Sequence, residues 1–215
     1  MAVATRPPQL TRPAPPPLED SRAFTVPWRG IAISILVVIA IMAAWSVTTN
    51  TYAVLGQQRL QDRWADTIAR GVALETAPEV GAPVARISIP DLGIERVVVE
   101  GSGLGELRTA PGHEPGSALP GSIGNSVIRG HRLLWSGPFR RIGELNFGAP
   151  IHVQLADGSV HTYIVAGIFH MRPNDPDIGS GESARPMLTL VTSDPPFRAD
   201  RVLVIKAILP AEETP

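Results

Sequence analysis

The chain has 215 residues, a formal net charge of −1 and 44% hydrophobic residues. This length accommodates one membrane segment and one globular domain of ordinary size, and it excludes two large domains. A near-neutral chain with scattered arginines presents no positively charged surface to nucleic acid, so we expect no nucleic-acid partner. The chain has no cysteine, which excludes disulfides and thiolate metal sites.

The amino-terminal part combines a proline-rich leader with an apolar segment. Residues 1–27 contain seven prolines and few large apolar side chains, which predicts a disordered tail. Residues 31–47 are uncharged and apolar, and with their flanks they extend over 28–49 and reach the length of a membrane-spanning helix, about 20 residues. Trp28 and Trp45 lie near its ends, as is typical of membrane interfaces. We expect a retained single-pass anchor rather than a cleaved signal peptide, because the leader is long and no A-x-A site follows the run.

A more polar segment, residues 50–80, follows the predicted span. Leu60, Trp64, Ile68 and Val72 recur in it at a spacing of four, which predicts a helical stalk with one narrow apolar stripe. The stripe either packs on the next domain or serves self-association or contact with the membrane surface. Two Ala-Pro pairs near residue 80 mark the boundary of that domain.

Residues 81–209 change to short apolar runs separated by glycine, proline and aspartate, which predicts strands and turns. The strongest local pattern is a hairpin of residues 151–155 and 160–165 around Asp157-Gly158. Five more strands are expected at residues 85–89, 95–99, 125–129, 187–192 and 201–208. Seven strands with little helix favour a mainly β fold, an antiparallel or mixed barrel. Residues 210–215 form a short carboxy-terminal tail.

Three side chains of different chemistry lie at the ends of predicted strands. Ser193 ends one strand, Arg201 begins the next, and His131 follows the strand at 125–129. If these strands are neighbours, the three residues meet at one mouth of the barrel. A nucleophile, a proton carrier and a cation for the oxyanion are the parts that acyl transfer needs. A strand-ending serine, a loop histidine and a strand-opening arginine also arise by chance.

The order and spacing of several short motifs resemble those of the sortase family, closest to class E, the type found in high-GC Gram-positive bacteria. The resemblance covers about residues 84–207. The motifs include Ile87-Ser88-Ile89-Pro90, Pro111-Gly112-His113, Gly130-His131-Arg132, Thr189-Leu190-Val191-Thr192-Ser193 and Arg201-Val202-Leu203-Val204.

This resemblance implies an eight-stranded sortase β-barrel behind one transmembrane helix, with the amino terminus cytoplasmic and the catalytic domain outside the plasma membrane. It implies cleavage of Leu-Pro/Ala-x-Thr-Gly-like sorting signals through an acyl-enzyme, and transfer of the protein to an amine of the cell wall or a pilin. By the same resemblance His131 is the catalytic histidine, Arg201 steadies the oxyanion, and Ser193 occupies the position of the family's cysteine. Thr192 and His113 are weaker substrate-binding candidates. We expect no cofactor and no metal.

The serine leaves three interpretations open. A serine hydroxyl has no anionic fraction comparable to that of a thiol with a pKa of about 8.5, and it needs an adjacent base. The chain is a working serine variant of a sortase, a pseudo-sortase that binds sorting signals or surface proteins without cutting them, or an engineered cysteine-to-serine form.

Four acidic residues allow more than one interpretation. Asp194 follows the serine directly and either orients His131 or, through its charge, disfavours an oxyanion. Asp175, Asp177 and Glu182 resemble the calcium sites of some sortases, but a polar loop rich in turn residues accounts for them equally well.

Overall fold

The computed structural model describes residues 28–180, 184–195 and 200–211. The predicted tail at residues 1–27 lies outside this part, as do Glu182 and the last four residues. The chain divides into two compact units between Ile41 and Met42.

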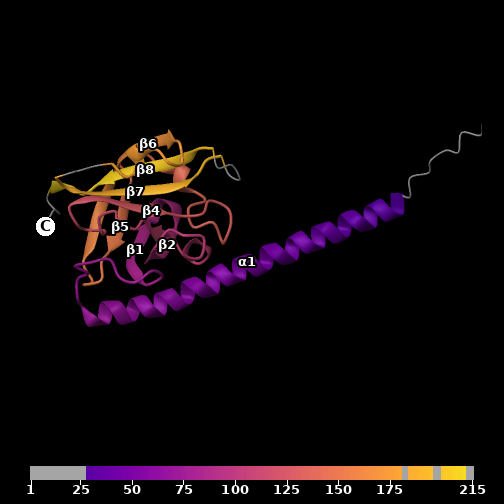
Figure 1. Ribbon diagram of the computed structural model, residues 1–215, viewed down its shortest axis with the longest axis horizontal. Helices are drawn as coiled ribbons and strands as arrows, with labels where there is room; N and C mark the ends of the chain where they lie inside the picture. The colour runs from indigo at the N-terminus through magenta and orange to yellow at the C-terminus, as the bar shows by residue number, and fades with distance from the viewer. Residues whose placement is uncertain (1–27, 181–183, 196–199, 212–215) are drawn as a thin grey trace, which may run out of the picture. The chain divides into compact units, whose positions relative to one another are not determined.

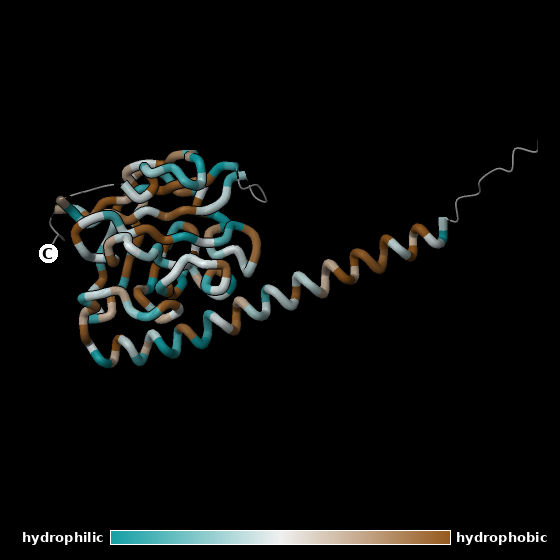
Figure 2. The backbone as a smooth tube through the Cα atoms, viewed as in Figure 1, coloured by the Kyte–Doolittle hydropathy of each residue, from teal (hydrophilic) through white to brown (hydrophobic). Residues whose placement is uncertain are grey.

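A single helix, α1 (Trp28–Arg70), contains both the predicted span and most of the predicted stalk. In the first unit its apolar side chains are exposed; Ile33 and Leu36, for example, are 62% and 65% accessible. The helix is long and apolar enough to cross a membrane, since 20 helical residues extend about 30 Å, the thickness of the hydrocarbon layer. Figure 2 shows this part of α1 mostly in brown and the later turns with more teal. The chain thus has one amino-terminal apolar helix of the kind that anchors a single-pass protein.

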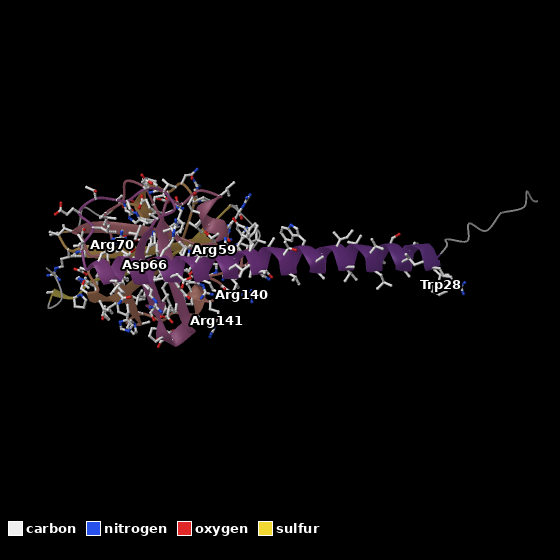
Figure 3. The ribbon with its side chains drawn as sticks, turned by 90° about the horizontal axis from the view of Figure 1, so that it is seen from below. Trp28, Arg59, Asp66, Arg70, Arg140 and Arg141 are labelled. Carbon is white, nitrogen blue, oxygen red and sulfur yellow. The ribbon has the colours of Figure 1, made fainter. Side chains whose placement is uncertain are left out.

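In the second unit, α1 buries one face against the barrel. The buried positions are Ala53, Gln57, Leu60, Trp64 and Thr67. Their spacing alternates between four and three residues, which keeps them on one side of a helix with 3.6 residues per turn. The exposed side carries charged residues, and Figure 3 labels Arg59, Asp66 and Arg70 on this helix.

The predicted stripe packs on the domain along only part of its length. Leu60 and Trp64 form a cluster with barrel residues such as Val97 and Val99, and Ile68 packs against it. Val72 is 67% exposed. A spacing of exactly four residues advances about 40° per step around the helix, so the stripe drifts away from the barrel, and α1 also ends before Val72. Packing on the domain is therefore confirmed for the first three residues.

Two features of α1 allow its close approach to the barrel. Gly56 faces Thr109, whose Cγ2 would lie 2.8 Å from a Cβ at that position. The amide of Gln57 donates from Nε2 to the carbonyl oxygens of Val97 and Thr109, both at 3.1 Å, and its Oε1 accepts from the Val97 backbone N–H at 3.2 Å. The side chain thereby satisfies backbone groups at the edge of a strand, which would otherwise be buried without partners.

Eight strands close into a barrel in the order β1-β2-β3-β4-β7-β8-β6-β5 (Figure 1). Their bounds are β1 (Pro83–Ile89), β2 (Ile94–Glu100), β3 (Gly112–His113), β4 (Gly124–Arg129), β5 (Pro150–Gln154), β6 (Val160–Met171), β7 (Pro186–Ser193) and β8 (Val202–Ile208). The pairing of β5 with β1 completes the closure. The predicted mainly β, eight-stranded fold is confirmed.

The interior of the barrel is filled by apolar side chains that alternate along the strands. Ile87, Tyr163, Leu190 and Ile205 are fully buried there, and the Tyr163 hydroxyl accepts a hydrogen bond from the Gly121 backbone N–H at 2.9 Å. Alternation places every second residue of a strand on the inner face. The barrel is a packed core, so a binding site must lie at its rim or outer surface.

Candidate active site

Strand pairing brings the ends of three strands to one edge of the barrel. β4 and β7 run parallel, with Arg129 opposite Val191, so the turn after β4 and the last residue of β7 lie together. β7 and β8 are antiparallel, with Ser193 opposite Val202, and the Asp194 backbone N–H donates to the Arg201 carbonyl oxygen at 3.1 Å. The predicted meeting of the strand ends at one mouth therefore occurs.

A cavity of about 220 Å³ lies at this edge, and His131, Ser193 and Arg201 all line it. The complete lining is Leu107, Arg129, Gly130, His131, Pro173, Val191, Thr192, Ser193, Arg201 and Val202. None of these lining residues is acidic. A hydroxyl, an imidazole and a guanidinium therefore share one partly apolar cavity.

His131 is half-buried, and its burial lowers the pKa of the imidazole below the ordinary value of 6.5. Desolvation has this effect because it disfavours the charged form. At neutral pH the ring is consequently neutral, with one nitrogen able to accept a proton. This is the protonation state that a general base requires.

Arg132, the residue after His131, joins the turn after β4 to the end of β7. Its Nη1 donates to the Ser193 carbonyl oxygen at 3.1 Å and to the Asp194 carboxylate. The other carboxylate oxygen of Asp194 lies 2.8 Å from His170 Nε2. The described ion pairs of Asp194 are thus with Arg132 and His170, and neither involves His131. Arg132 compensates the negative charge beside Ser193.

The sequence assigned no role to Arg132 or His170. Arg132 was visible in the Gly130-His131-Arg132 motif, but its partner Asp194 lies 62 residues away. His170 lies one residue before the end of β6, which the alternation pattern predicts only as far as residue 165. No local pattern predicts either contact.

Thr192 and His113 are placed very differently. Thr192 is 3% exposed and lines the cavity, and its Oγ1 donates to the Gly130 carbonyl oxygen at 2.8 Å. This hydrogen bond connects β7 to Gly130, the residue before His131. His113 is fully buried in β3 and is absent from the cavity lining.

His113 belongs to a buried polar cluster. Its Nδ1 lies 2.7 Å from Glu100 Oε2 and its Nε2 2.9 Å from the Ala118 carbonyl oxygen. A carbonyl oxygen can only accept, so Nε2 carries a proton. The structure brings His113 to a carboxylate inside the domain and not to the predicted site.

The acidic residues after β6 form part of a turn that one of them stabilises. Asp175 caps a short 3-10 helix, Pro176–Ile178, where its carboxylate accepts from the Asp177 backbone N–H at 3.0 Å. Within the described residues, no group of three or more His, Cys, Asp or Glu is arranged to hold a metal ion. A second cavity of about 350 Å³ lies here and shares Arg129 and Pro173 with the first, so the two adjoin.

Comparisons with known proteins agree with this architecture. The sortase domain family model matches residues 87–209. Sortase D of Bacillus subtilis (strain 168) is 30% identical over 118 residues, which cover 55% of this chain and 58% of the relative. The chain therefore matches somewhat more than half the length of that relative.

Two solved structures show the same fold. The Clostridium perfringens Sortase D5 transpeptidase has 25% identity and a TM-score of 0.62, covering 75% of this chain and 99% of that chain. Sortase E from Streptomyces avermitilis has 29% identity and a TM-score of 0.54, covering 62% and 91%. Similarity to both types does not single out class E, which stays a prediction. Because the family model matches more than half of its residues and the barrel is shared, the chain belongs to the sortase family.

Proposed function

We propose that the chain is a membrane-anchored sortase of the class E type that acts on sorting-signal peptides through an acyl-enzyme on Ser193. The observation that carries this proposal is the cavity shared by His131, Ser193 and Arg201. The adjoining second cavity extends the space available to a peptide beyond the reacting groups. Secreted surface proteins are the proposed substrates, and an amine of the cell wall or a pilin is the proposed acceptor.

In the proposed mechanism His131 takes the hydroxyl proton of Ser193 as Oγ attacks the scissile carbonyl carbon. The carbonyl oxygen becomes an oxyanion that the Arg201 guanidinium stabilises. Collapse of this intermediate breaks the peptide C–N bond, and His131 returns the proton to the leaving amine. The acceptor amine then attacks the ester and regenerates the serine; water in its place gives hydrolysis.

We further propose that α1 spans the membrane with the amino terminus in the cytoplasm, so that the barrel lies outside. The apolar part of α1 supports a single span, and the barrel's membership of the sortase family supports the outward side. Protease treatment of intact cells tests this topology, because an external barrel is digested and a cytoplasmic one is protected.

The alternative function is a pseudo-sortase that binds the same peptides without cutting them. The specific observation in its favour is Ser193 itself, since serine lacks the thiolate fraction on which cysteine nucleophiles depend. Both functions use the same cavity and differ only in the chemical step.

Intact-mass measurement of acyl-enzyme formation separates them. The full chain in mild detergent is mixed with a library of sorting peptides, because the later turns of α1, with Leu60 and Trp64, pack against the barrel as part of the domain. Three forms are compared: the unchanged chain, Ser193→Cys and Ser193→Ala. An adduct on the unchanged chain that Ser193→Ala abolishes supports a serine sortase. An adduct on Ser193→Cys alone supports the pseudo-sortase, and no adduct on any form contradicts acyl transfer at this site.

A further inference from the structure

The loop that carries His131 adopts an unfavourable backbone conformation. Trp135 and Ser136 have φ angles of 53° and 62°, and Gly137 follows with φ 50°. Left-handed φ angles are rare for bulky side chains and persist only where the surrounding structure holds them. Gly137 adopts this φ without penalty, and its backbone N–H closes the turn by donating to the Leu134 carbonyl oxygen at 2.9 Å. Trp135 and Ser136 carry the penalty, and contacts from outside the loop help to hold them.

Those contacts come from α1, immediately after the predicted membrane span. The Ser136 backbone N–H donates to Asn50 Oδ1 at 3.0 Å. The ring of Trp135 meets that of Tyr52 edge to face, with centroids 6.0 Å apart and planes at 70°. The guanidinium of Arg108 lies 5.5 Å from the centroid of the Trp135 ring. A hydrogen bond and an aromatic pair thus join this loop to one turn of the helix.

The other end of the same loop lies at the candidate active site. His131 lines the cavity, and Arg132 contacts both the Ser193 carbonyl oxygen and the Asp194 carboxylate. The His131 carbonyl oxygen accepts from the Phe139 backbone N–H at 3.1 Å. Ser136 lies only five positions after His131, so the conformation at one end restricts the other.

We propose that Asn50 and Tyr52 are positioning residues, through which the helix leaving the membrane holds the His131 loop in the conformation that lines the cavity. The part of this inference that concerns turnover rests on the proposed function; the part that concerns loop order does not. Release of the loop from α1 frees the left-handed residues to relax and increases the solvation of His131. The site is then fully assembled only while this turn of α1 is docked.

Hydrogen exchange tests the loop directly in the full chain reconstituted in detergent or lipid. Asn50→Leu removes the acceptor, and Asn50→Asp keeps it; Tyr52→Ala removes the ring, and Tyr52→Phe keeps it. Thr51→Ala, between the two and exposed, is the matched control. We expect Asn50→Leu and Tyr52→Ala to speed exchange at residues 131–139 by about tenfold or more, with no change in the three control variants or in β1 and β5.

The pKa of His131, measured by NMR, shows whether the effect reaches the site. Burial lowers this pKa, so loop release should return it toward 6.5 in Asn50→Leu and leave it low in Asn50→Asp. If acylation occurs, kcat should fall about tenfold with KM nearly unchanged. Unchanged exchange in an Asn50→Leu/Tyr52→Ala double variant overturns the proposal, and so does faster exchange with an unshifted His131 pKa. Asn50 and Tyr52 are both exposed, so their substitution leaves the buried core unchanged. Failure of acylation in every form counts against the proposed function alone.

Discussion

Trp64 lies in the interface between α1 and the barrel, so the loss of stability when it is substituted tests that interface quantitatively. Trp64 is 2% exposed, packs in a cluster with Val97 and Val99, and donates from Nε1 to Gln154 Oε1 at 3.1 Å. Truncating a buried aromatic side chain to alanine costs about 3–5 kcal/mol. Loss of the hydrogen bond is part of that cost, at about 1 kcal/mol. Trp64→Ala should therefore remove a large share of a domain stability of about 5–15 kcal/mol.

Urea unfolding of the full chain in detergent, followed by circular dichroism of the barrel, measures this cost. Trp64→Phe keeps most of the ring and should lose about 1–2 kcal/mol. Val72→Ala changes a side chain of the same predicted stripe that is 67% exposed and should change stability by less than about 0.5 kcal/mol. Equal midpoints for Trp64→Ala and Val72→Ala would show that α1 is not part of the folded domain.

Three further predictions concern the site and its supports. Acylation of Ser193 should increase with pH, with an acidic midpoint below 6.5, because burial lowers the pKa of His131; a midpoint above 6.5 contradicts its role as a neutral base. His113→Ala leaves Glu100 buried without its partner and should cost about 3–5 kcal/mol in urea unfolding, whereas replacing both by leucine should cost less. Arg132→Leu removes the arginine partner of Asp194, whose negative charge lies beside Ser193, and should slow acylation at least about tenfold; adding Asp194→Asn should restore part of the rate, and no restoration excludes the electrostatic explanation.

The strands could be predicted from the sequence wherever alternation is regular. All seven predicted strands are present, because a strand with one buried face needs an apolar residue at every second position. β3 was missed because two residues cannot show a period. β6 extends to Met171 beyond a register shift between Val165 and Gly167, and a bulge of this kind interrupts the alternation on which the prediction depends.

The face of α1 could be predicted only in part. The apolar stripe identified Leu60 and Trp64, but the buried face also contains Gln57 and Thr67. A polar residue on a buried face has no signature in the hydropathy pattern. Its role depends on the backbone groups it contacts, and for Gln57 these belong to Val97 and Thr109, 40 and 52 residues further along the chain.

The candidate site shows the same division between local and long-range information. His131, Ser193 and Arg201 could be placed at strand ends, and strand pairing brings them together. Their supports could not be predicted. The Asn50 contact with Ser136 joins residues 86 positions apart, and it depends on the left-handed backbone of a loop whose residues, Trp135 and Ser136, do not favour that conformation.

Two arginines at or next to the cavity are paired with carboxylates, which compensate their positive charge. Arg129 pairs with Glu114; burial raises the pKa of that carboxyl, but hydrogen bonds from Ser102 and Arg129 outweigh this and lower it. Arg132 pairs with Asp194. Among the described ion pairs, none involves Arg201.

In the proposed mechanism Arg201 is therefore the cavity arginine that stabilises the developing oxyanion. A cation stabilises a thiolate before substrate binds, so in Ser193→Cys it would assist the resting nucleophile as well as the transition state. A serine hydroxyl is neutral at rest, and the same cation then acts only when the oxyanion forms. In the proposed mechanism of the unchanged chain, acylation therefore depends on proton transfer to a neutral His131, and the lowering of its pKa by burial favours the serine mechanism.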